Sequence, residues 1–408
     1  MSRRLAMLQI FRHREPRLLV TGQTISMFGD GVANVALTLL VLDTTHSVSK
    51  LAWFATARMT PLVLLLLVGG AIVDRHSRRT LLLISDLARG ALTAGLVVAL
   101  ATGVLQFWQL LVFAVLFGSF DAIFTPAMSA MIPEIVPEDL LGAMNAVRPF
   151  SNNVVGGMIG PAVGGLIAAW STTAAMSIDA ASFLASATAL VLMHPTPKPS
   201  RVASSTMIHE IKEGVGYVRS TNWIWTTLTA VTLGNALLFT PTNVLVPYFL
   251  RHDLHAAKVT IGYFFATFGL AGAIGALVSG SLAIPRRRIR AMWMAWTAAS
   301  GVMFVFGFVT QSWEVFLVPI VTAPGILYGN VVWESMLQAV VPRTLLGRVS
   351  SVDWFVSLGL APVGLVAAGY LSSLVGVRTY FVAAAIVSTA PGLFILFSKR
   401  LNAVDDGR

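Results

Sequence analysis

Long uninterrupted apolar runs, separated by short polar or charged stretches, make up most of this chain. A helix needs about 20 apolar residues to cross the hydrocarbon core of a bilayer. The runs predict such helices at roughly 17–42, 50–73, 80–103, 107–132, 141–170, 172–194, 222–250, 258–284, 290–310, 313–341, 347–374 and 376–398. A transmembrane β-barrel would instead show alternating segments of about ten residues. We therefore predict an all-α membrane protein with twelve transmembrane helices.

Composition agrees with a chain whose surface faces the lipid bilayer. Of the 408 residues, 56% are hydrophobic and 11% are charged, and the mean hydropathy is +0.78. Soluble domains carry about 25% charged residues. The net charge of +10 lies in the loops, so it does not indicate a nucleic-acid partner. The chain has no cysteine, which excludes disulfides and thiol-based sites, and we predict no cofactor and no bound metal.

The basic residues are distributed unevenly between the two sides of the predicted membrane domain. Of 28 Lys and Arg residues, three lie in the interior of predicted spans, 4 lie in loops or at span ends on one side, and 21 share a side with both termini. The positive-inside rule therefore places both termini in the cytoplasm. The basic segment before the first helix resembles the start of a signal peptide. The helix that follows is too long and has no cleavage site, so we predict that it is retained.

The longest loop divides the chain into two similar parts. We predict an N-terminal six-helix half at 1–194, a cytoplasmic linker with a short surface helix at 195–221, and a C-terminal six-helix half at 222–408. The sequence VPEDLLG at 136–142 recurs as VPRTLLG at 341–347, at the equivalent position of the second half. Two parallel halves around a central path are typical of many secondary transporters.

A short charged loop follows the second predicted helix. Five of its residues have a distinctive spacing: Gly70, Asp74, Arg75, Arg78 and Arg79. This spacing resembles the loop signature G-x-x-x-D-R-x-x-R-R of the major facilitator superfamily, although Ser77 stands where the family usually has glycine. The resemblance implies that Asp74 is a conformational latch. It would meet the N-terminus of the eleventh helix, near Gly347 and Arg348, in the outward-facing state.

The fifth predicted helix carries a second group of regularly spaced residues: Gly156, Gly160, Pro161, Gly164 and Gly165. Glycines four residues apart allow helix backbones to pack closely, whatever the function. The pattern also resembles the antiporter motif of drug:proton exporters of the superfamily. That resemblance implies export and a kinked helix that packs closely against a helix of the other half. Segments at 22–31 and 179–183 resemble the macrolide-exporter and enterobactin-exporter branch.

Six charged residues inside predicted spans are candidates for proton or substrate binding: Asp30, Arg58, Asp121, Arg148, Glu334 and Asp353. Charges at the centre of a membrane helix cost about 2.5–3.5 kcal/mol on insertion scales, so each one needs a reason. As a proton site, a carboxyl group loads a proton on one side and releases it on the other, or binds a cationic drug in its place. Asp30 and Asp121 are the strongest candidates for that role.

The alternative is that these charges form structural ion pairs. They would join Arg58 to Asp30 or Asp43, Asp86 to Arg89, and Arg148 to Glu334 or Asp353. Many proton-coupled drug exporters also carry an arginine in the fourth helix, four residues before a glycine. Here Ala114 precedes Gly118, so that relay is absent and the coupling ion stays open.

These features predict a secondary exporter of small amphipathic or drug-like molecules in the bacterial inner membrane. It would work by alternating access as a monomer, in exchange for protons, and it would confer antibiotic resistance. Trp333 beside Glu334, and Phe124 near Asp121, would line apolar cavities for aromatic or amphipathic cations. The alternative for each of these rings is a position that faces the lipid.

Three rival functions remain, of which an uptake carrier is disfavoured by the motif of the fifth helix. A siderophore exporter of the same fold would show a basic cavity around Arg58 and Arg148. A non-transporting scaffold or receptor would pair every embedded carboxyl. The sequence has no Walker loop and no nucleophile elbow, so we do not predict an enzyme.

Overall fold

The computed structural model describes residues 9–137, 140–141, 144, 147–148, 151–194, 207–281, 286–342 and 345–397. The side chains at 66–71, 74, 207–211 and 280–281 lie outside this description. Within these ranges the chain is helical and forms no strand. Eleven helical segments are long and apolar enough to cross a membrane. The 28-residue helix α3 supplies a twelfth, so the predicted all-α fold with twelve spans is confirmed.

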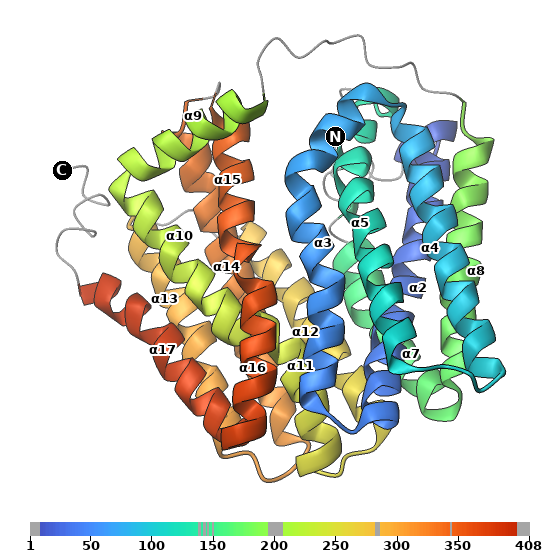
Figure 1. Cartoon of the computed structure of the whole chain (residues 1–408). Coiled ribbons are helices and arrows are strands. Elements are labelled where there is room, and N and C mark those ends of the chain that lie inside the picture. Colours follow the sequence, from blue (N-terminus) through green and yellow to red (C-terminus); the bar gives the residue numbers. More distant parts are fainter. Residues whose placement is uncertain are drawn as a thin grey trace. The chain divides into compact units, whose positions relative to one another are not determined.

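The first six spanning segments follow the predicted ranges closely. They are α2 (Arg14–Thr45), α3 (Val48–Arg75), α4 (Arg78–Ala101), α5 (Phe107–Ile135), the π-helical segment η2 (Ser151–Ile159) with α7 (Gly160–Trp170), and α8 (Thr172–Leu192). Figure 1 shows these helices, with α2, α3, α4, α5, α7 and α8 labelled. A helix satisfies its own backbone hydrogen bonds, which is why apolar segments of this length adopt it in lipid.

The last six spanning segments contain more breaks in their helical geometry. They are α10 (Asn222–Gly234) with η3 (Asn235–Phe239), α11 (Thr240–Tyr248) and η4 (Phe249–Asp253), then α12 (Lys258–Ser281), α13 (Arg288–Gly301) with η5 (Val302–Gly307), η6 (Glu314–Phe316) with α14 (Leu317–Val340), α15 (Leu346–Gly359) with α16 (Ala361–Val375), and α17 (Val377–Phe397). A further helix, α9 (Met207–Ser220), lies in the predicted linker. Pro241 and Pro362 each stand in the first turn of a helix that follows such a break, where a missing N–H costs little.

The chain forms two compact units. The first unit comprises Met1–His46, Ala57–Val202 and Ala257–Gly269, and the second comprises Ser47–Thr56, Ala203–Ala256 and Leu270–Arg408. These units differ from the predicted halves because the N-terminal ends of α3 and α12 each belong to the opposite unit. The division into halves at 1–194 and 222–408 stays a prediction.

In the first unit, α2 packs along α7 and α8, and α4 packs against α5 and α8 (Figure 1). Small residues bring α2 and α8 close together. A Cβ atom at Gly22 would lie 2.7 Å from the Cβ of Ala189. In the second unit, α13 packs against α14 and α17, and α10 packs against α15.

The internal sequence repeat forms the same turn in both units. Val136 and Val341 end α5 and α14 in extended conformation, because the proline that follows each valine disfavours the helical conformation. Leu140 and Leu345 then donate their backbone N–H to the carbonyl of that proline at 2.9 and 2.8 Å. Both valines lie in an apolar cluster of their own unit. The repeat therefore has a structural cause in the equivalent helix ends.

Candidate functional site

Arg89 of α4 lies at the centre of a buried group of charges in the first unit. Its side chain is almost fully buried, and its Nη2 and Nη1 atoms donate to Asp86 Oδ1 at 2.6 Å and Asp121 Oδ1 at 2.8 Å. Three aromatic rings cover the guanidinium with centroids 4.3–5.8 Å from Cζ: Phe117, Phe124 and Phe183. A buried arginine held this way is costly to remove, because its carboxyl partners would lose their counter-charge.

Asp86, one helical turn before Arg89, is fully satisfied by its neighbours. Its Oδ2 accepts hydrogen bonds from Ser186 Oγ at 2.6 Å and from Gln23 Nε2 at 3.4 Å, in addition to the ion pair with Arg89. These partners come from α8 and α2. The predicted structural pair between Asp86 and Arg89 is confirmed, and it ties three helices together.

Asp121 of α5 is paired with two arginines. Besides Arg89, its Oδ2 lies 3.6 Å from Arg58 Nη2. The prediction that Arg58 pairs with Asp30 or Asp43 is therefore wrong, because its ion-pair partner is Asp121. Asp43 pairs with Lys258, with 2.6 Å between Oδ2 and Nζ. Asp121 therefore links α3, α4 and α5. The apolar pattern of the sequence did not specify how these three helices are rotated about their own axes.

Two further carboxyls belong to this region without an ion pair. Within the described residues, neither Asp30 of α2 nor Asp179 of α8 has a basic group within 4 Å, although Arg58 and Arg89 interact with both electrostatically. We call these six residues the charge network: Asp30, Arg58, Asp86, Arg89, Asp121 and Asp179. Its carboxyls outnumber its guanidinium groups, so the network has room for protons or for a cationic ligand.

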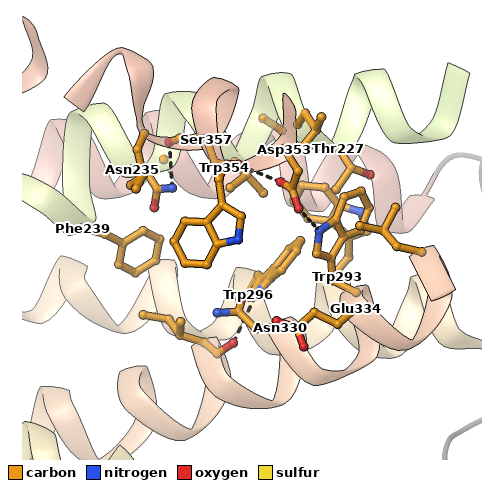
Figure 2. Close-up of a pocket in the computed structure, with 18 of the residues that line it drawn as sticks. Thr227, Asn235, Phe239, Trp293, Trp296, Asn330, Glu334, Asp353, Trp354 and Ser357 are labelled. Carbon is orange, nitrogen blue, oxygen red and sulfur yellow. Dashed lines mark hydrogen bonds between the residues drawn. The ribbon is translucent and has the colours of Figure 1, made fainter. Parts of the chain in front are cut away.

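A cavity of about 420 Å³ lies within the second unit, among α10, α13, α14 and α15. Four indole rings contribute to its wall: Trp293, Trp296, Trp333 and Trp354. Glu334 and Asp353 add carboxyl groups, and the described residues that line it include no Lys or Arg. Figure 2 labels three of these rings, Trp293, Trp296 and Trp354, and both carboxyl groups around the open space. We call it the tryptophan cavity.

Hydrogen bonds hold one side of the tryptophan cavity in place. Trp333 Nε1 donates to Asp353 Oδ2 at 2.8 Å, and Ser357 Oγ donates to Asp353 Oδ1 at 3.1 Å (Figure 2). Trp296 packs against Trp293 with centroids 5.5 Å apart and nearly perpendicular planes, a favourable edge-to-face arrangement. Glu334 is exposed to the cavity. The predicted cavity beside Trp333 and Glu334 is therefore present.

At the second predicted cavity, near Phe124 and Asp121, the aromatic ring already has a cationic partner. Phe124 packs on the guanidinium of Arg89, with 4.3 Å between its centroid and Cζ, so its face is already occupied. Arg148 lines a separate space of only about 10 Å³ and lies 3.5 Å from Ser129 Oγ. This space is too small for a drug-sized ligand.

The arginines of the charged loop brace the ends of two helices. Arg79 donates from Nε to the carbonyl of Leu190 at 2.6 Å and from Nη2 to the carbonyl of Val191 at 2.8 Å. These carbonyls lie in the last turn of α8, where a cation is favourable. Arg78 pairs with Glu134 near the end of α5 at 3.0 Å. Arg75 is exposed.

The predicted latch itself falls mostly outside the described side chains. Gly70 and Asp74 lie in α3, but the surroundings of Gly70 and the side chain of Asp74 lie outside the described part of the chain. The latch contact of Asp74 therefore stays a prediction.

The glycines of the predicted antiporter motif use two faces of the fifth span. Cβ atoms at Gly160 and Gly164 would lie 2.9 Å from Gly31 Cα and 2.6 Å from Val32 O, both in α2. A Cβ at Gly165 would lie 2.7 Å from Gly262 Cα in α12. Gly156 also lies against α2, next to Met27. One face thus packs within the predicted N-terminal half, and the other contacts a helix of the predicted C-terminal half.

Pro161 stands in the first turn of α7, directly after the π-helical η2. π-Helical segments widen the helix locally and often mark functional positions. The kink predicted for this helix thus coincides with a change of helical type beside the glycines.

Comparison with known proteins decides the family. The sequence profile described as Major Facilitator Superfamily matches residues 19–357. The chain belongs to this superfamily. Solved transporter structures share this fold: nucleoside transporter NupG superposes with a TM-score of 0.73 at 11% identity, covering 92% of this chain and 98% of that one. A bacterial homologue of the iron transporter ferroportin, in an inward-facing state, gives 0.69 at 16% identity, covering 93% and 98%.

Among curated superfamily proteins, several relatives are efflux proteins. Multidrug efflux pump Tap of Mycobacterium tuberculosis is 29% identical over 415 residues, which cover 96% of each chain. Macrolide efflux protein A of Streptococcus pyogenes is 22% identical over 369 residues, covering 88% of this chain and 90% of that protein. The similarity therefore extends along nearly the whole of this multi-pass membrane transporter.

Sequence reasoning missed the importance of Arg89 and Asp179 in this superfamily member. The sequence predicts Arg89 only as the partner of Asp86, and Asp179 stands there only within the family-like segment at 179–183. Both lie inside spans that also carry other charges, which is the signal that could have included them. Asp353 and Glu334 were predicted, and the structure brings both to the tryptophan cavity.

Proposed function

We propose that this transporter exports amphipathic, drug-like cations across the bacterial inner membrane in exchange for protons. The tryptophan cavity is the observation that carries this proposal, because it combines aromatic faces and carboxyls. The efflux names of relatives similar along nearly the whole chain support export rather than uptake. Both termini lie in the cytoplasm, in agreement with the distribution of Lys and Arg.

The tryptophan cavity suits an organic cation of drug size. Its volume of about 420 Å³ falls within the roughly 300–1,000 Å³ of ordinary ligand pockets. Each indole face attracts a desolvated cation by about 0.5–2 kcal/mol. Asp353, fixed by Trp333 and Ser357, and Glu334, exposed to the cavity, supply the negative charge. A cation of this kind gains from the aromatic wall and from both carboxyls together.

The charge network is the proposed proton site. Asp30 is half-buried and has no ion pair within the described part of the chain. Its carboxyl group can therefore gain or lose a proton without the loss of an ion pair. Asp121 is held by Arg58 and Arg89 and supplies fixed negative charge. A proton on Asp30 weakens the attraction of α2 for these arginines. Loading and unloading of Asp30 therefore changes the forces between α2, α3 and α4.

Two motifs are proposed to control alternating access. The glycine faces of the fifth span form a close-packed pivot, because their contacts leave no room for a side chain. Asp74 is the latch that contacts the N-terminus of α15 when the transporter is outward-facing. Asp74→Asn is expected to reduce transport without reducing membrane insertion. Normal transport by a normally inserted variant would remove the latch from this mechanism.

The siderophore alternative is less well supported. It needs a basic cavity around Arg58 and Arg148 to bind an anionic chelator. Arg58 instead faces Asp121 within a network rich in carboxyls, and Arg148 lines a space of about 10 Å³. A pure scaffold is also disfavoured, because Asp30 and Asp179 have no ion pair in the described chain.

Accumulation of a fluorescent cationic dye in drug-hypersensitive cells tests the proposal. Cells expressing the full chain should accumulate less dye, a protonophore should reverse the effect, and Asp30→Asn should abolish it. Ser119→Ala, which alters a partly exposed position of α5 whose hydroxyl donates only to the Val115 carbonyl, is the control and should export normally. Unchanged dye accumulation, with the wild-type protein present in the membrane, would contradict export of cations.

A further inference from the structure

Asp179 of α8 is a buried carboxyl group that its surroundings leave almost unsatisfied. Its side chain is 1% exposed. Its Oδ1 has no hydrogen-bond partner among the described residues, and its Oδ2 accepts only a long 3.5 Å hydrogen bond from Thr93 Oγ1. Ser182 Oγ, the nearest hydroxyl on its own helix, donates to the main-chain carbonyl of Asp179 instead.

Asp86 provides the comparison within the same unit. It is equally buried, but it has a guanidinium, a hydroxyl and an amide as partners. An ionised carboxylate is stable in such a place because its charge is matched and its oxygens are bonded. Asp179 has neither form of compensation. An ionised Asp179 would be a costly buried charge, whereas a protonated one would be a neutral polar group.

The groups that face Asp179 come from each helix packed around it. Asp30 from α2, Arg58 from α3 and Arg89 from α4 interact with it electrostatically, and Thr93 from α4 provides the weak hydrogen bond. Asp121 of α5 acts on Asp30 and engages both arginines. The adjoining helix α7 contains no titratable side chain. The arginines are thus bonded to other carboxyls, and neither is an ion-pair partner of Asp179.

The backbones of α2 and α8 approach closely beside these two carboxyls. A Cβ atom at Gly29, the residue before Asp30, would lie 2.9 Å from Asp179 Oδ1 and 2.6 Å from Ser182 Cβ. No side chain can separate the helices at this level. Asp30 is the more exposed of the two carboxyls, so it is the one through which a proton reaches or leaves the pair.

We propose that Asp179 is a proton-binding residue of this transporter, which holds a proton in the described conformation and shares it with Asp30 across the α2–α8 contact. In the transfer step, the O–H bond of Asp179 breaks, one O–H bond forms on the Asp30 carboxylate, and the pair keeps a charge of minus one. The coupling role of this step rests on the proposed proton-driven export. Proton binding by Asp179 does not depend on it.

Infrared difference spectroscopy of the purified full-length protein tests proton binding directly. The carbonyl stretch of a protonated carboxyl should be present in the wild type at neutral pH and lost in Asp179→Asn. Asp121→Asn, which changes a carboxyl bonded to two arginines, should keep it. Thr93→Val retains the carboxyl but removes its hydrogen bond, so the band should shift to higher frequency. A band absent from the wild type, or unchanged in Asp179→Asn, would overturn the proposal.

Transport assays then separate this proposal from the proposed function. In vesicles, Asp179→Asn should keep energy-independent exchange of tetraphenylphosphonium but lose export driven by a pH gradient. Export by Asp179→Asn that still follows the pH gradient would overturn the coupling role. If the wild type does not move tetraphenylphosphonium at all, the proposed function fails, while the infrared result still decides whether Asp179 binds a proton.

Discussion

The two units use aromatic rings and carboxyl groups in opposite ways. In the first unit, Phe117, Phe124 and Phe183 close over Arg89, whose charge is already matched by Asp86 and Asp121. In the second unit, four tryptophans surround an open cavity whose described wall carries carboxyls without a basic partner. The units differ in whether the protein or the substrate supplies the positive charge. The protein supplies it in the charge network, and we propose that the substrate supplies it in the tryptophan cavity.

This comparison predicts unequal sensitivity to substitution. Removing one member of a buried charge network leaves its partners as buried charges without a counter-charge. Removing a side chain from the wall of an open cavity only enlarges the space that ligand or solvent fills. Stability should therefore respond mainly to changes in the charge network, and ligand affinity mainly to changes in the tryptophan cavity.

The largest effect is expected for Arg89→Ala. The change leaves Asp86, which is 0% exposed, without its counter-charge. We expect a loss of about 3–5 kcal/mol of stability, seen as a sharply lower thermal unfolding midpoint in size-exclusion assays of the detergent-solubilised protein. Trp354→Ala, at an exposed cavity position, should change the midpoint little. Equal midpoints for the two variants would contradict the contrast between the units.

The second largest effect is expected for Gly160→Val in the first unit. Its Cβ would meet Gly31 Cα and the Phe28 carbonyl at 2.9 Å, and a backbone contact cannot be relieved by a rotamer change. Overpacking of this kind costs about 1–3 kcal/mol. Gly95→Val is the matched control, because a Cβ at Gly95 meets nothing within 4 Å. Unfolding midpoints measured side by side should fall only for Gly160→Val, and a similar fall in both would remove the packing explanation.

A third prediction concerns affinity rather than stability. Trp354 in the tryptophan cavity and Trp313 elsewhere in the second unit are both 61% exposed. Trp354→Ala removes an indole face worth about 0.5–2 kcal/mol, so the Kd for radiolabelled tetraphenylphosphonium should rise by roughly 2- to 30-fold. Trp313→Ala should leave it unchanged. An identical Kd in both variants would mean that the cation binds outside this cavity.

The smallest effect is expected for Asp353→Asn. Its amide oxygen can still accept the hydrogen bond from Trp333 Nε1, so the cavity wall keeps its shape while one charge is lost. In a water-accessible cavity such a charge contributes about 0.2–1 kcal/mol. Binding of a cationic dye should weaken by that amount, and binding of an uncharged analogue of the same shape should not. Equal losses for both ligands would indicate altered shape rather than lost charge.

Part of the candidate site was predictable because it depends on local sequence. Asp86 and Arg89 lie three residues apart on one helix, so their side chains must share a face. Trp333 and Glu334 are neighbours, and their helix brings both to the tryptophan cavity. Pairings between helices were not predictable in this way, as the correction for Arg58 shows.

The sequence by itself determined the twelve spans, the repeated turn at Val136 and Val341, and the superfamily. The length of a span follows from bilayer thickness, and the end of a helix follows from the position of a proline. Both features therefore depend on the local sequence alone. Only the tertiary structure decided that Asp121 meets Arg58 and Arg89, and that Asp179 lacks an ion-pair partner within the described chain. Membrane helices are apolar on most faces, so hydrophobicity does not fix their rotation. Close packing and the pairing of buried charges fix it instead.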